Sequence, residues 1–338
     1  MPRKFDVPTL ARGVRESDRA AVAQAITLVE SKLPAHRPLA RQLLTELTAT
    51  PSNAVRVGIS GVPGAGKSTF INSMGQRLIE QGHKVAVLAV DPSSTRTGGS
   101  VLGDRTRMGE LTQSPNAFVR PSPSGNHLGG VARATREAML VVEAAGYDVI
   151  IVETVGVGQS EVAVAGMVDT FLMLALARSG DQLQGIKRGI LEITDVIAVN
   201  KADGDNAGEA RVTARELSIA MKLVQQSGDR RVPVMTCSAL QRISLDEVWQ
   251  AVLDHRAWLD ENRGLAQHRA EQQVVWMRSQ TESTLLDSMR ATADLRELRA
   301  RLEKDVRTGR TSAMEASQSF LASYAAAVPG FDWATPAG

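Results

Sequence analysis

The spacing of hydrophobic residues changes along the chain, and each spacing predicts a different kind of structure. Within residues 15–50, apolar positions such as Val22 and Ile26 recur at helical intervals and are interrupted at Pro34. Such intervals place an apolar stripe along one side of a helix. The pattern therefore predicts an N-terminal helical extension, to which we assign residues 1–50.

From residue 55 onward, short apolar runs alternate with longer segments of helical pattern. The runs are 55–60, 84–91, 147–154, 171–177, 195–203 and 233–239. Because nearly every position in them is apolar, they predict strands buried on both faces, as in a parallel sheet. Segments 130–146 and 207–227 are long enough for crossover helices. The sequence therefore predicts an α/β fold over residues 51–262, with a doubly wound, mostly parallel sheet.

The remainder of the chain, residues 263–338, has a helical pattern. “SLDE” (Ser244 to Glu247) and “SAME” (Ser312 to Glu315) are predicted capping boxes, each opening a helix. Residues 266–307 contain no proline or glycine and carry a narrow apolar stripe, which predicts one long helical stretch. Such a stripe is buried either on the α/β domain or against a second subunit, and the pattern alone leaves both open.

Composition narrows the functional classes. The 338 residues include 39 Lys and Arg and 37 Asp and Glu, a formal net charge of +2, without a dense basic block that would indicate a nucleic-acid partner. A single cysteine, Cys237, excludes a disulfide within the chain and a cysteine-rich metal site, and fits a cytoplasmic setting. No apolar run approaches the ~20 residues of a membrane span, and the first residues lack an apolar signal core. We therefore expect a cytoplasmic protein with neither a membrane nor a nucleic-acid partner.

A phosphate-binding loop follows the first predicted strand. Gly61, Gly66, Lys67 and Ser68 fit the pattern G-x-x-x-x-G-K-[ST] between a strand and a helix. Its glycines let successive N–H groups point at phosphates, Lys67 brings a mobile cation, and Ser68 offers a hydroxyl to Mg²⁺. The predicted phosphate-binding residues are Gly61, Pro63, Gly64, Ala65, Gly66, Lys67, Ser68 and Thr69.

A second motif, “NKAD”, closes a later strand and predicts the choice of base. The Asp203 carboxylate can accept hydrogen bonds from guanine N1–H and NH₂, whereas adenine would leave it unpaired at a cost of about 1–3 kcal/mol. Lys201 can lie along the base, and Asn200 can tie loops together. “CSAL” ends the next strand with backbone N–H groups for the guanine carbonyl, and Cys237 within it is interpreted as a core residue. The predicted guanine-binding residues are Asn200, Lys201, Asp203, Ser238, Ala239 and Leu240.

Acidic residues at predicted strand ends or in the loops that follow complete the expected site. Asp91, Asp104 and Glu153 are candidates, with Ser68, for the Mg²⁺ site, and the alternative for each is a helix cap or a surface charge. Gly156 is placed to sense the γ-phosphate, and Gln159 to orient the attacking water. Three arginines could stabilise transition-state charge or bind a partner, and neither role is assigned: Arg96, Arg105 and Arg107.

Together these motifs resemble the MeaB/ArgK family of P-loop GTPases. The strings that carry the likeness are “GVPGAGKST”, “AVDPSSTRTGGSVLGDRTRM”, “RPSPSGNHLGG”, “VETVGVGQSE”, “GDQLQGIKRGI” and “NKAD”, and it covers most of residues 15–260. The resemblance implies a SIMIBI-class GTPase that acts as a chaperone of adenosylcobalamin-dependent acyl-CoA mutases, above all methylmalonyl-CoA mutase. It implies slow GTP hydrolysis that the mutase accelerates, and control over loading and off-loading of the cobalamin cofactor.

The same resemblance implies the cofactors and partners. We expect Mg²⁺, GTP as substrate and GDP as product, with no cobalamin bound directly. We expect a homodimer through the C-terminal helices of residues 263–338, and a cobalamin adenosyltransferase as a further partner. The motif match places Asp91, Asp104 and Glu153 on the family's Mg²⁺ and switch carboxylates. It places Asp181 and Lys187, in the mobile loop 180–189, as catalytic candidates that respond to the partner.

Two other functions remain as alternatives. A nickel- or metal-insertion GTPase shares the fold class but needs His or Cys ligands, and no such cluster is evident in the sequence. A P-loop kinase would use the same phosphate loop with ATP, which the Asp203 carboxylate disfavours.

Overall fold

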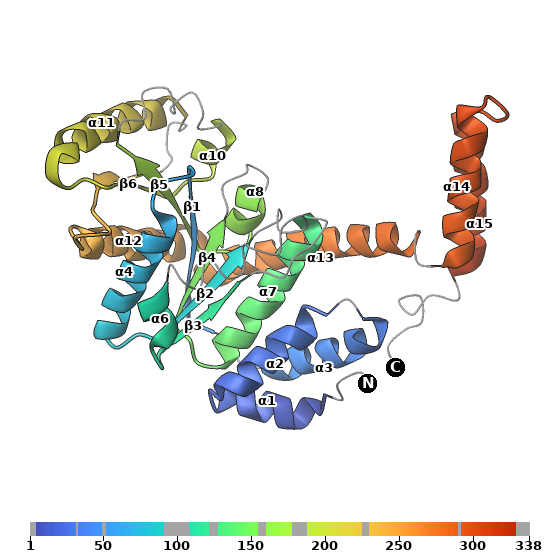
Figure 1. Ribbon diagram of the computed structural model, residues 1–338, viewed down its shortest axis with the longest axis horizontal. Helices are drawn as coiled ribbons and strands as arrows, with labels where there is room; N and C mark the ends of the chain where they lie inside the picture. The colour runs from blue at the N-terminus through green and yellow to red at the C-terminus, as the bar shows by residue number, and fades with distance from the viewer. Residues whose placement is uncertain are drawn as a thin grey trace. The chain divides into compact units, whose positions relative to one another are not determined.

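A single parallel sheet forms the centre of the fold (Figure 1). The computed structural model describes residues 5–31, 33–48, 52–90, 108–121, 128–154, 160–177, 188–224, 230–289 and 292–328. The strands are β1 (Val55–Gly61), β2 (Val85–Val90), β3 (Ala117–Arg120), β4 (Val149–Thr154), β5 (Thr170–Leu176), β6 (Val196–Asn200) and β7 (Val234–Thr236). Their order is β3-β2-β4-β1-β5-β6-β7 and every neighbouring pair is parallel, which confirms the predicted α/β fold.

Helices cover both faces of this sheet (Figure 1). One face packs against α4 (Lys67–Glu80), α6 (Gly109–Gln113) and α12 (Leu245–Arg263). The other packs against α7 (Leu128–Ala144), α8 (Ser160–Ala165), α10 (Arg188–Glu192) and α11 (Ala207–Val224). Within β4, Ile151 faces the first core and Ile150 the second. The strands are therefore apolar at successive positions because both of their faces are buried.

The N-terminal helices form a further layer over α7 (Figure 1). They are α1 (Val7–Arg15), α2 (Arg19–Val29), the 3₁₀ turn η1 (Pro34–His36) and α3 (Arg37–Leu47). The Asp18 carboxylate caps α2 by accepting a hydrogen bond from the Ala20 N–H at 3.0 Å. Val22 and Ile26 are buried, as the helical spacing predicted. Helix α1 begins earlier than that spacing indicated, because Pro8 in its first turn favours helix initiation.

Two sequence expectations about local structure were wrong. Strand β3, with the sequence AFVR, was not predicted, since four residues carry little periodic signal. Ser244 does not form a capping box: its φ is 55° and its side chain makes no cap hydrogen bond, although α12 does begin at the next residue. A short 3₁₀ turn, η2 (Gly204–Asn206), precedes α11.

The C-terminal helical stretch is divided, which corrects the prediction of one continuous helix. Helix α13 (Leu265–Ser288) ends before α14 (Ala293–Arg307). Thr292 caps the new helix, its hydroxyl accepting a hydrogen bond from the Leu295 N–H at 3.2 Å. A threonine N-cap ends a helical pattern without needing proline or glycine. The capping box at Ser312, which opens α15 (Ala313–Ala327), is confirmed.

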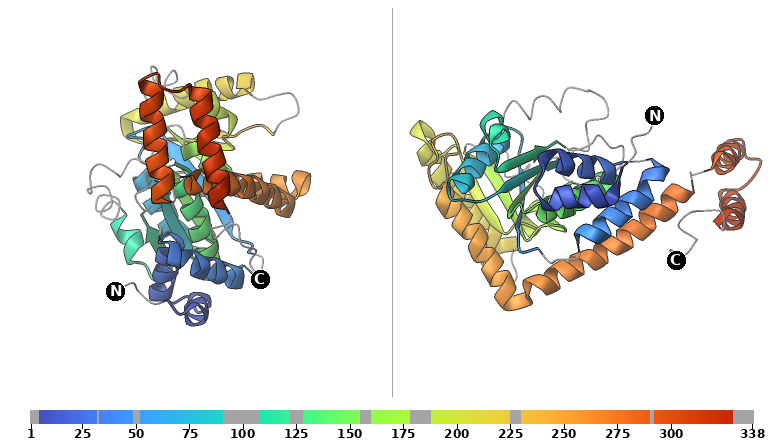
Figure 2. Two further views of the ribbon diagram at one scale, coloured as in Figure 1. Left: turned by 90° about the vertical axis from the view of Figure 1, so that its right-hand side faces the viewer. Right: turned by 90° about the horizontal axis from the view of Figure 1, so that it is seen from below.

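The chain divides into two compact units, residues 1–272 and 273–338. In the second unit, α14 and α15 lie side by side as a hairpin (Figure 2). A mostly apolar groove of about 560 Å³ runs along this hairpin, lined by residues that include Leu302, Val306 and Phe320. In the parts of the chain that the structure describes, no helix is both long and apolar enough to cross a membrane.

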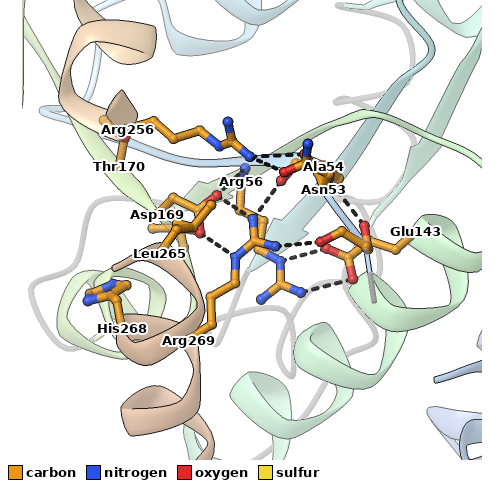
Figure 3. Close-up of polar contacts among 12 residues, drawn as sticks. Asn53, Ala54, Arg56, Glu143, Asp169, Thr170, Arg256, Leu265, His268 and Arg269 are labelled. Carbon is orange, nitrogen blue, oxygen red and sulfur yellow. Dashed lines mark hydrogen bonds and ion pairs between the residues drawn. The ribbon is translucent and has the colours of Figure 1, made fainter. Parts of the chain in front are cut away.

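Within the first unit, Arg269 and Asp169 form a buried ion pair at the amino-terminal edge of the sheet, which we call the arginine clamp (Figure 3). Arg269 of α13 donates to both Asp169 carboxylate oxygens, at 2.8 and 2.6 Å, and to the Ala54 carbonyl oxygen at 2.6 Å. Asp169 also accepts a hydrogen bond from the Arg56 N–H at 3.1 Å, and the Arg56 side chain pairs with Glu143 at 2.6 Å. The clamp joins the starts of β1 and β5 to α13, at the edge opposite the predicted nucleotide site.

Candidate nucleotide-binding site

The phosphate loop connects β1 to α4, as predicted (Figure 1). Gly66 precedes the helix with φ of 83°, and a side chain there would approach Asn200 Nδ2 to 2.9 Å. Glycine is therefore required both by the left-handed backbone and by the contact with the neighbouring loop. Ser68 and Thr69 lie in the first turn of α4, where free N–H groups and the helix dipole favour an anion.

Lys67 lies among carboxylates at the start of α4. Its Nζ donates to the Gly61 carbonyl oxygen at 2.7 Å, so the side chain bends back over its own loop. Burial lowers the pKa of Lys67, while the negative charges of Glu153 and Glu161 act to raise it. Glu153 is only 7% exposed and lies near the end of β4, opposite Ile59 of β1. The half-buried ammonium group stands at the start of α4, where the helix N-terminus favours phosphate oxygens.

Asn200 links the phosphate loop to the loop that follows β7. It is 1% exposed at the end of β6. Its Nδ2 donates to the Ala65 carbonyl oxygen at 2.8 Å, and its Oδ1 accepts from the Ala239 N–H at 3.0 Å. One side-chain amide therefore connects two loops that are far apart in the sequence. The sequence analysis predicted this role for Asn200.

Asp203 lies just beyond β6, next to the loop after β7. Its carboxylate accepts a hydrogen bond from the Ser238 hydroxyl, which restricts its orientation. Lys201 is exposed with φ of 62°, and Leu240 is also exposed. Ser238, Ala239 and Cys237 are buried, and burial raises the pKa of the Cys237 thiol to about 12. The thiol is therefore protonated at neutral pH and packs as a core residue, as interpreted from the sequence.

Oxygen donors suited to a hard cation flank the phosphate loop. The Ser68 hydroxyl and the Glu153 carboxylate are of the kind that Mg²⁺ prefers, and both adjoin the loop. Across the described ranges, no three His, Cys, Asp or Glu residues are grouped so as to hold a metal ion by themselves. The remaining predicted site residues lie outside the described residues: Asp91, Asp104, Gly156, Gln159, Asp181 and Lys187, together with Arg96, Arg105 and Arg107.

The structure adds a buried polar group that the sequence reasoning missed. Glu161, in the first turn of α8, is fully buried close to Ser60 and Ser160. A glutamate at the start of a helix resembles an ordinary surface charge in sequence. The available signal was its position directly after the Gly-rich turn of “VETVGVGQSE”.

A phosphate loop between β1 and α4, with an Asn-Lys-x-Asp loop at the end of β6 on the same edge of a parallel sheet, defines a P-loop GTPase. The sequence model of the family described as “Methylmalonyl Co-A mutase-associated GTPase MeaB” matches residues 22–294. The chain belongs to this family.

Individual relatives cover nearly the whole chain. A probable GTPase of Mycobacterium tuberculosis is 54% identical over 316 residues, 93% of this chain and 94% of the relative. GTPase ArgK of Escherichia coli K12 is 49% identical over 284 residues, covering 84% and 86%. The mouse protein “Methylmalonic aciduria type A homolog, mitochondrial” is 42% identical over 329 residues, covering 94% and 79%. A crystal structure described as an LAO/AO transport system kinase has 39% identity and a TM-score of 0.73, covering 95% and 98%.

Proposed function

We propose that this GTPase is a chaperone of an adenosylcobalamin-dependent acyl-CoA mutase, with methylmalonyl-CoA mutase as the first candidate. It controls loading of the cofactor and protects or reactivates the mutase in the cytoplasm, without binding cobalamin itself. The observation that carries the proposal is the family match over residues 22–294, since that family is described by its association with this mutase. The mouse relative, named for methylmalonic aciduria, supports the same partner.

In this proposal the phosphate loop holds GTP. Lys67 and the N–H groups at the start of α4 bind the outer phosphates, where negative charge is present in the substrate and the transition state. Ser68, Glu153, Asp91 and Asp104 would hold Mg²⁺, which when bound neutralises phosphate charge.

Two further segments supply the remaining proposed roles. Gly156 senses the γ-phosphate through its N–H group, and Gln159 orients the attacking water. Asp181 and Lys187 belong to the loop that responds to the mutase, so that hydrolysis is slow without the partner.

The guanine assignment rests on Asp203 and its contact with Ser238. The related crystal structure is described as a kinase, so the nucleotide has to be tested for this chain directly. We expect GTP to displace a fluorescent GDP analogue at concentrations at least tenfold below those ATP needs, because adenine lacks the N1–H and NH₂ donors that guanine offers to the Asp203 carboxylate. Stronger displacement by ATP would contradict the guanine assignment.

The second unit is the proposed dimerisation arm. The groove along α14 and α15 carries apolar residues such as Leu302 and Phe320, and the surface beside it exposes Met314 and Leu321. Burying such a face against the same face of a second copy would give a two-fold dimer. A cobalamin adenosyltransferase is a further proposed partner, as the source of the cofactor.

The central experiment measures GTP turnover with and without the mutase. We expect about 10⁻⁴ to 10⁻² s⁻¹ for the protein alone, which is typical of P-loop GTPases that await a stimulating group. Adding methylmalonyl-CoA mutase should raise the rate at least tenfold, and Lys67→Ala should remove activity under both conditions. A wild-type rate that no acyl-CoA mutase of the host changes would contradict the chaperone proposal while leaving the GTPase intact.

A further inference from the structure

A cavity within the first unit lies at the amino-terminal edge of the sheet, away from the nucleotide motifs. It has a volume of about 770 Å³ and is lined by residues before β5 and β6, the carboxyl-terminal parts of α11 and α12, and the start of α13. The strands are parallel, so their carboxyl ends, which carry the nucleotide motifs, lie at the opposite edge. A cavity of this size accommodates a small molecule, and neither nucleotide motif accounts for it.

The two aspartates that line this cavity are already engaged by the protein. Asp169 accepts hydrogen bonds from Arg269 on both of its oxygens, at 2.8 and 2.6 Å. One Asp195 oxygen accepts a hydrogen bond from the Phe171 N–H at 2.8 Å, and the other lies 3.2 Å from His255 Nε2. Because all four carboxylate oxygens have partners of this kind, these two acids do not form an empty site for a cation.

Basic side chains from three segments line the same cavity. Arg263 ends α12, Arg230 lies shortly before β7, and His268 lies in the first turn of α13. The Arg263 guanidinium lies over the Trp258 ring, 5.7 Å from its centre, and forms no hydrogen bond or ion pair with a described residue. Glu192 of α10 also lines the cavity but is exposed to solvent. The N–H groups of Arg263 are therefore available to a ligand.

The hydrogen bonds around His268 determine which of its ring nitrogens donates. Gln272 Nε2 donates to the Val168 carbonyl oxygen at 2.8 Å and lies 2.9 Å from His268 Nε2. Because the amide nitrogen is a donor, His268 Nε2 accepts, and the proton of the neutral imidazole is on Nδ1. No described residue accepts a hydrogen bond from that Nδ1. His268 therefore adds a second available donor to the lining.

The positive charge of the lining acts on the buried His255. Burial lowers the pKa of His255 to about 4, and the charges of Arg230, His268 and Arg263 act in the same direction, against that of Asp169. A site that disfavours an added positive charge favours a negative one. The available donors and the electrostatics of the cavity therefore both suit an anion.

We propose that this cavity binds a small organic anion, whose carboxylate or phosphate group is held by Arg263, Arg230 and His268. Helices α10 and α11 contribute apolar side chains such as Leu191 and Met221, which suit a short carbon body. The anion site goes beyond the proposed chaperone function, because neither the phosphate loop nor the mutase takes part in it.

Titration of the GDP-saturated protein with small anions tests the proposal, because GDP and Mg²⁺ keep an added anion away from the phosphate loop. The ligands are succinate, glycerol 3-phosphate and uncharged succinamide, which has the carbon body of succinate. By calorimetry we expect succinate, glycerol 3-phosphate or both to bind saturably with a Kd below about 1 mM, and succinamide to bind at least about tenfold more weakly. Binding of only one anion identifies the preferred group as carboxylate or phosphate.

The variant Arg263→Gln locates the binding. It removes one charged donor, so the Kd for the anion should rise at least about tenfold. Because Arg263 is exposed, thermal unfolding of the variant should match that of the wild type. Arg211→Gln is the matched control: Arg211 is exposed on α11 outside the cavity lining, and its replacement should leave the Kd unchanged.

Three results would overturn the inference. The first is no saturable binding of either anion by the wild type up to about 10 mM, and the second is equal binding of succinamide and succinate. The third is a wild-type Kd for folded Arg263→Gln; if that variant does not fold, Arg230→Gln is judged by the same criterion. Stimulation of GTP turnover by the mutase is measured separately, so either proposal can fail while the other stands.

Discussion

Replacing Asn200 by alanine should damage both ends of the nucleotide site at once. Its amide bonds the Ala65 carbonyl oxygen at 2.8 Å and the Ala239 N–H at 3.0 Å. Ala65 is 0% exposed and Ala239 is 2% exposed, so water does not readily replace the lost amide. The substitution therefore leaves one buried acceptor and one buried donor without this partner.

The expected magnitude follows from those two groups. An unsatisfied buried polar group costs about 1–3 kcal/mol, so the two together cost about 2–6 kcal/mol. Partial relaxation of the loops around Asn200 lowers this, and we expect the free energy of unfolding to fall by about 3 kcal/mol. If the substitution destabilises the nucleotide-binding conformation of the two loops by the same amount, the Kd for GDP rises about 100-fold, since about 1.4 kcal/mol corresponds to tenfold.

Urea denaturation and titration with a fluorescent GDP analogue measure the two effects on the same protein. Asn262→Ala is the matched control: Asn262 is exposed on α12, and its amide donates to the Trp258 carbonyl oxygen at 2.8 Å. That substitution should cost less than about 0.5 kcal/mol and leave GDP binding unchanged. The reasoning is refuted if Asn200→Ala loses less than about 1 kcal/mol of stability and binds GDP like the wild type.

Three further changes have expected outcomes. Arg269→Met leaves the Asp169 carboxylate buried without its cation, so the free energy of unfolding in urea should fall by about 3–5 kcal/mol while GDP affinity of the folded protein is unchanged. Asp203→Asn should lower GTP affinity at least about tenfold and raise affinity for xanthosine triphosphate, which has a carbonyl oxygen where guanine has NH₂. Burial lowers the pKa of His255 to about 4 and raises that of Asp195 to about 7. The ordinary pKa values are 6.5 for His255 and 3.8 for Asp195. Between about pH 4 and 6.5, therefore, the folded protein keeps a proton on Asp195 that the unfolded chain has lost. In the same range the unfolded chain carries a proton on His255 that the folded protein lacks. The two effects cancel in wild-type denaturation curves, whereas Asp195→Asn should lose up to about 1.4 kcal/mol per pH unit as pH falls from about 6.5 to about 4.

Each of these outcomes can fail in a definite way. An Arg269→Met protein within about 1 kcal/mol of wild type would show that the clamp contributes little to stability. Unchanged discrimination between GTP and xanthosine triphosphate by Asp203→Asn would show that this carboxylate does not read the base. A stability profile of Asp195→Asn as flat as that of the wild type would show that His255 does not titrate in the assigned range.

The sequence predicted the parts of the site in which backbone geometry dictates the residue type. Gly66 is required by the left-handed turn into α4, and the motifs placed Lys67 and Asp203 beyond the carboxyl ends of the buried strands β1 and β6. These residues could be placed without tertiary contacts because consecutive parallel strands bring their carboxyl ends to one edge. The order of the strands was not evident from the sequence, because apolar runs buried on both faces look alike.

What the sequence did not predict depends on contacts between distant segments. Glu161 is buried only because α8 packs tightly on β1, and Asp169 becomes a clamp residue only when α13 brings Arg269 to it. The division of the C-terminal helix at Thr292 was missed for a different reason. A threonine cap carries a weaker local signal than proline or glycine.

Because all neighbouring strands are parallel, the nucleotide-binding residues and the Asp169–Arg269 clamp lie at opposite edges of the sheet. The carboxyl ends carry Lys67, Asn200 and Asp203, whereas the amino ends carry the clamp of Asp169 and Arg269. Loss of the clamp leaves the buried Asp169 charge without its cation, and no nucleotide contact depends on that charge, so it should lower stability without changing affinity. Loss of Asn200 removes bonds that belong to the fold and to the site together, so stability and affinity should fall in parallel. Comparing the two variants therefore tests whether this GTPase can be destabilised without disturbing its switch.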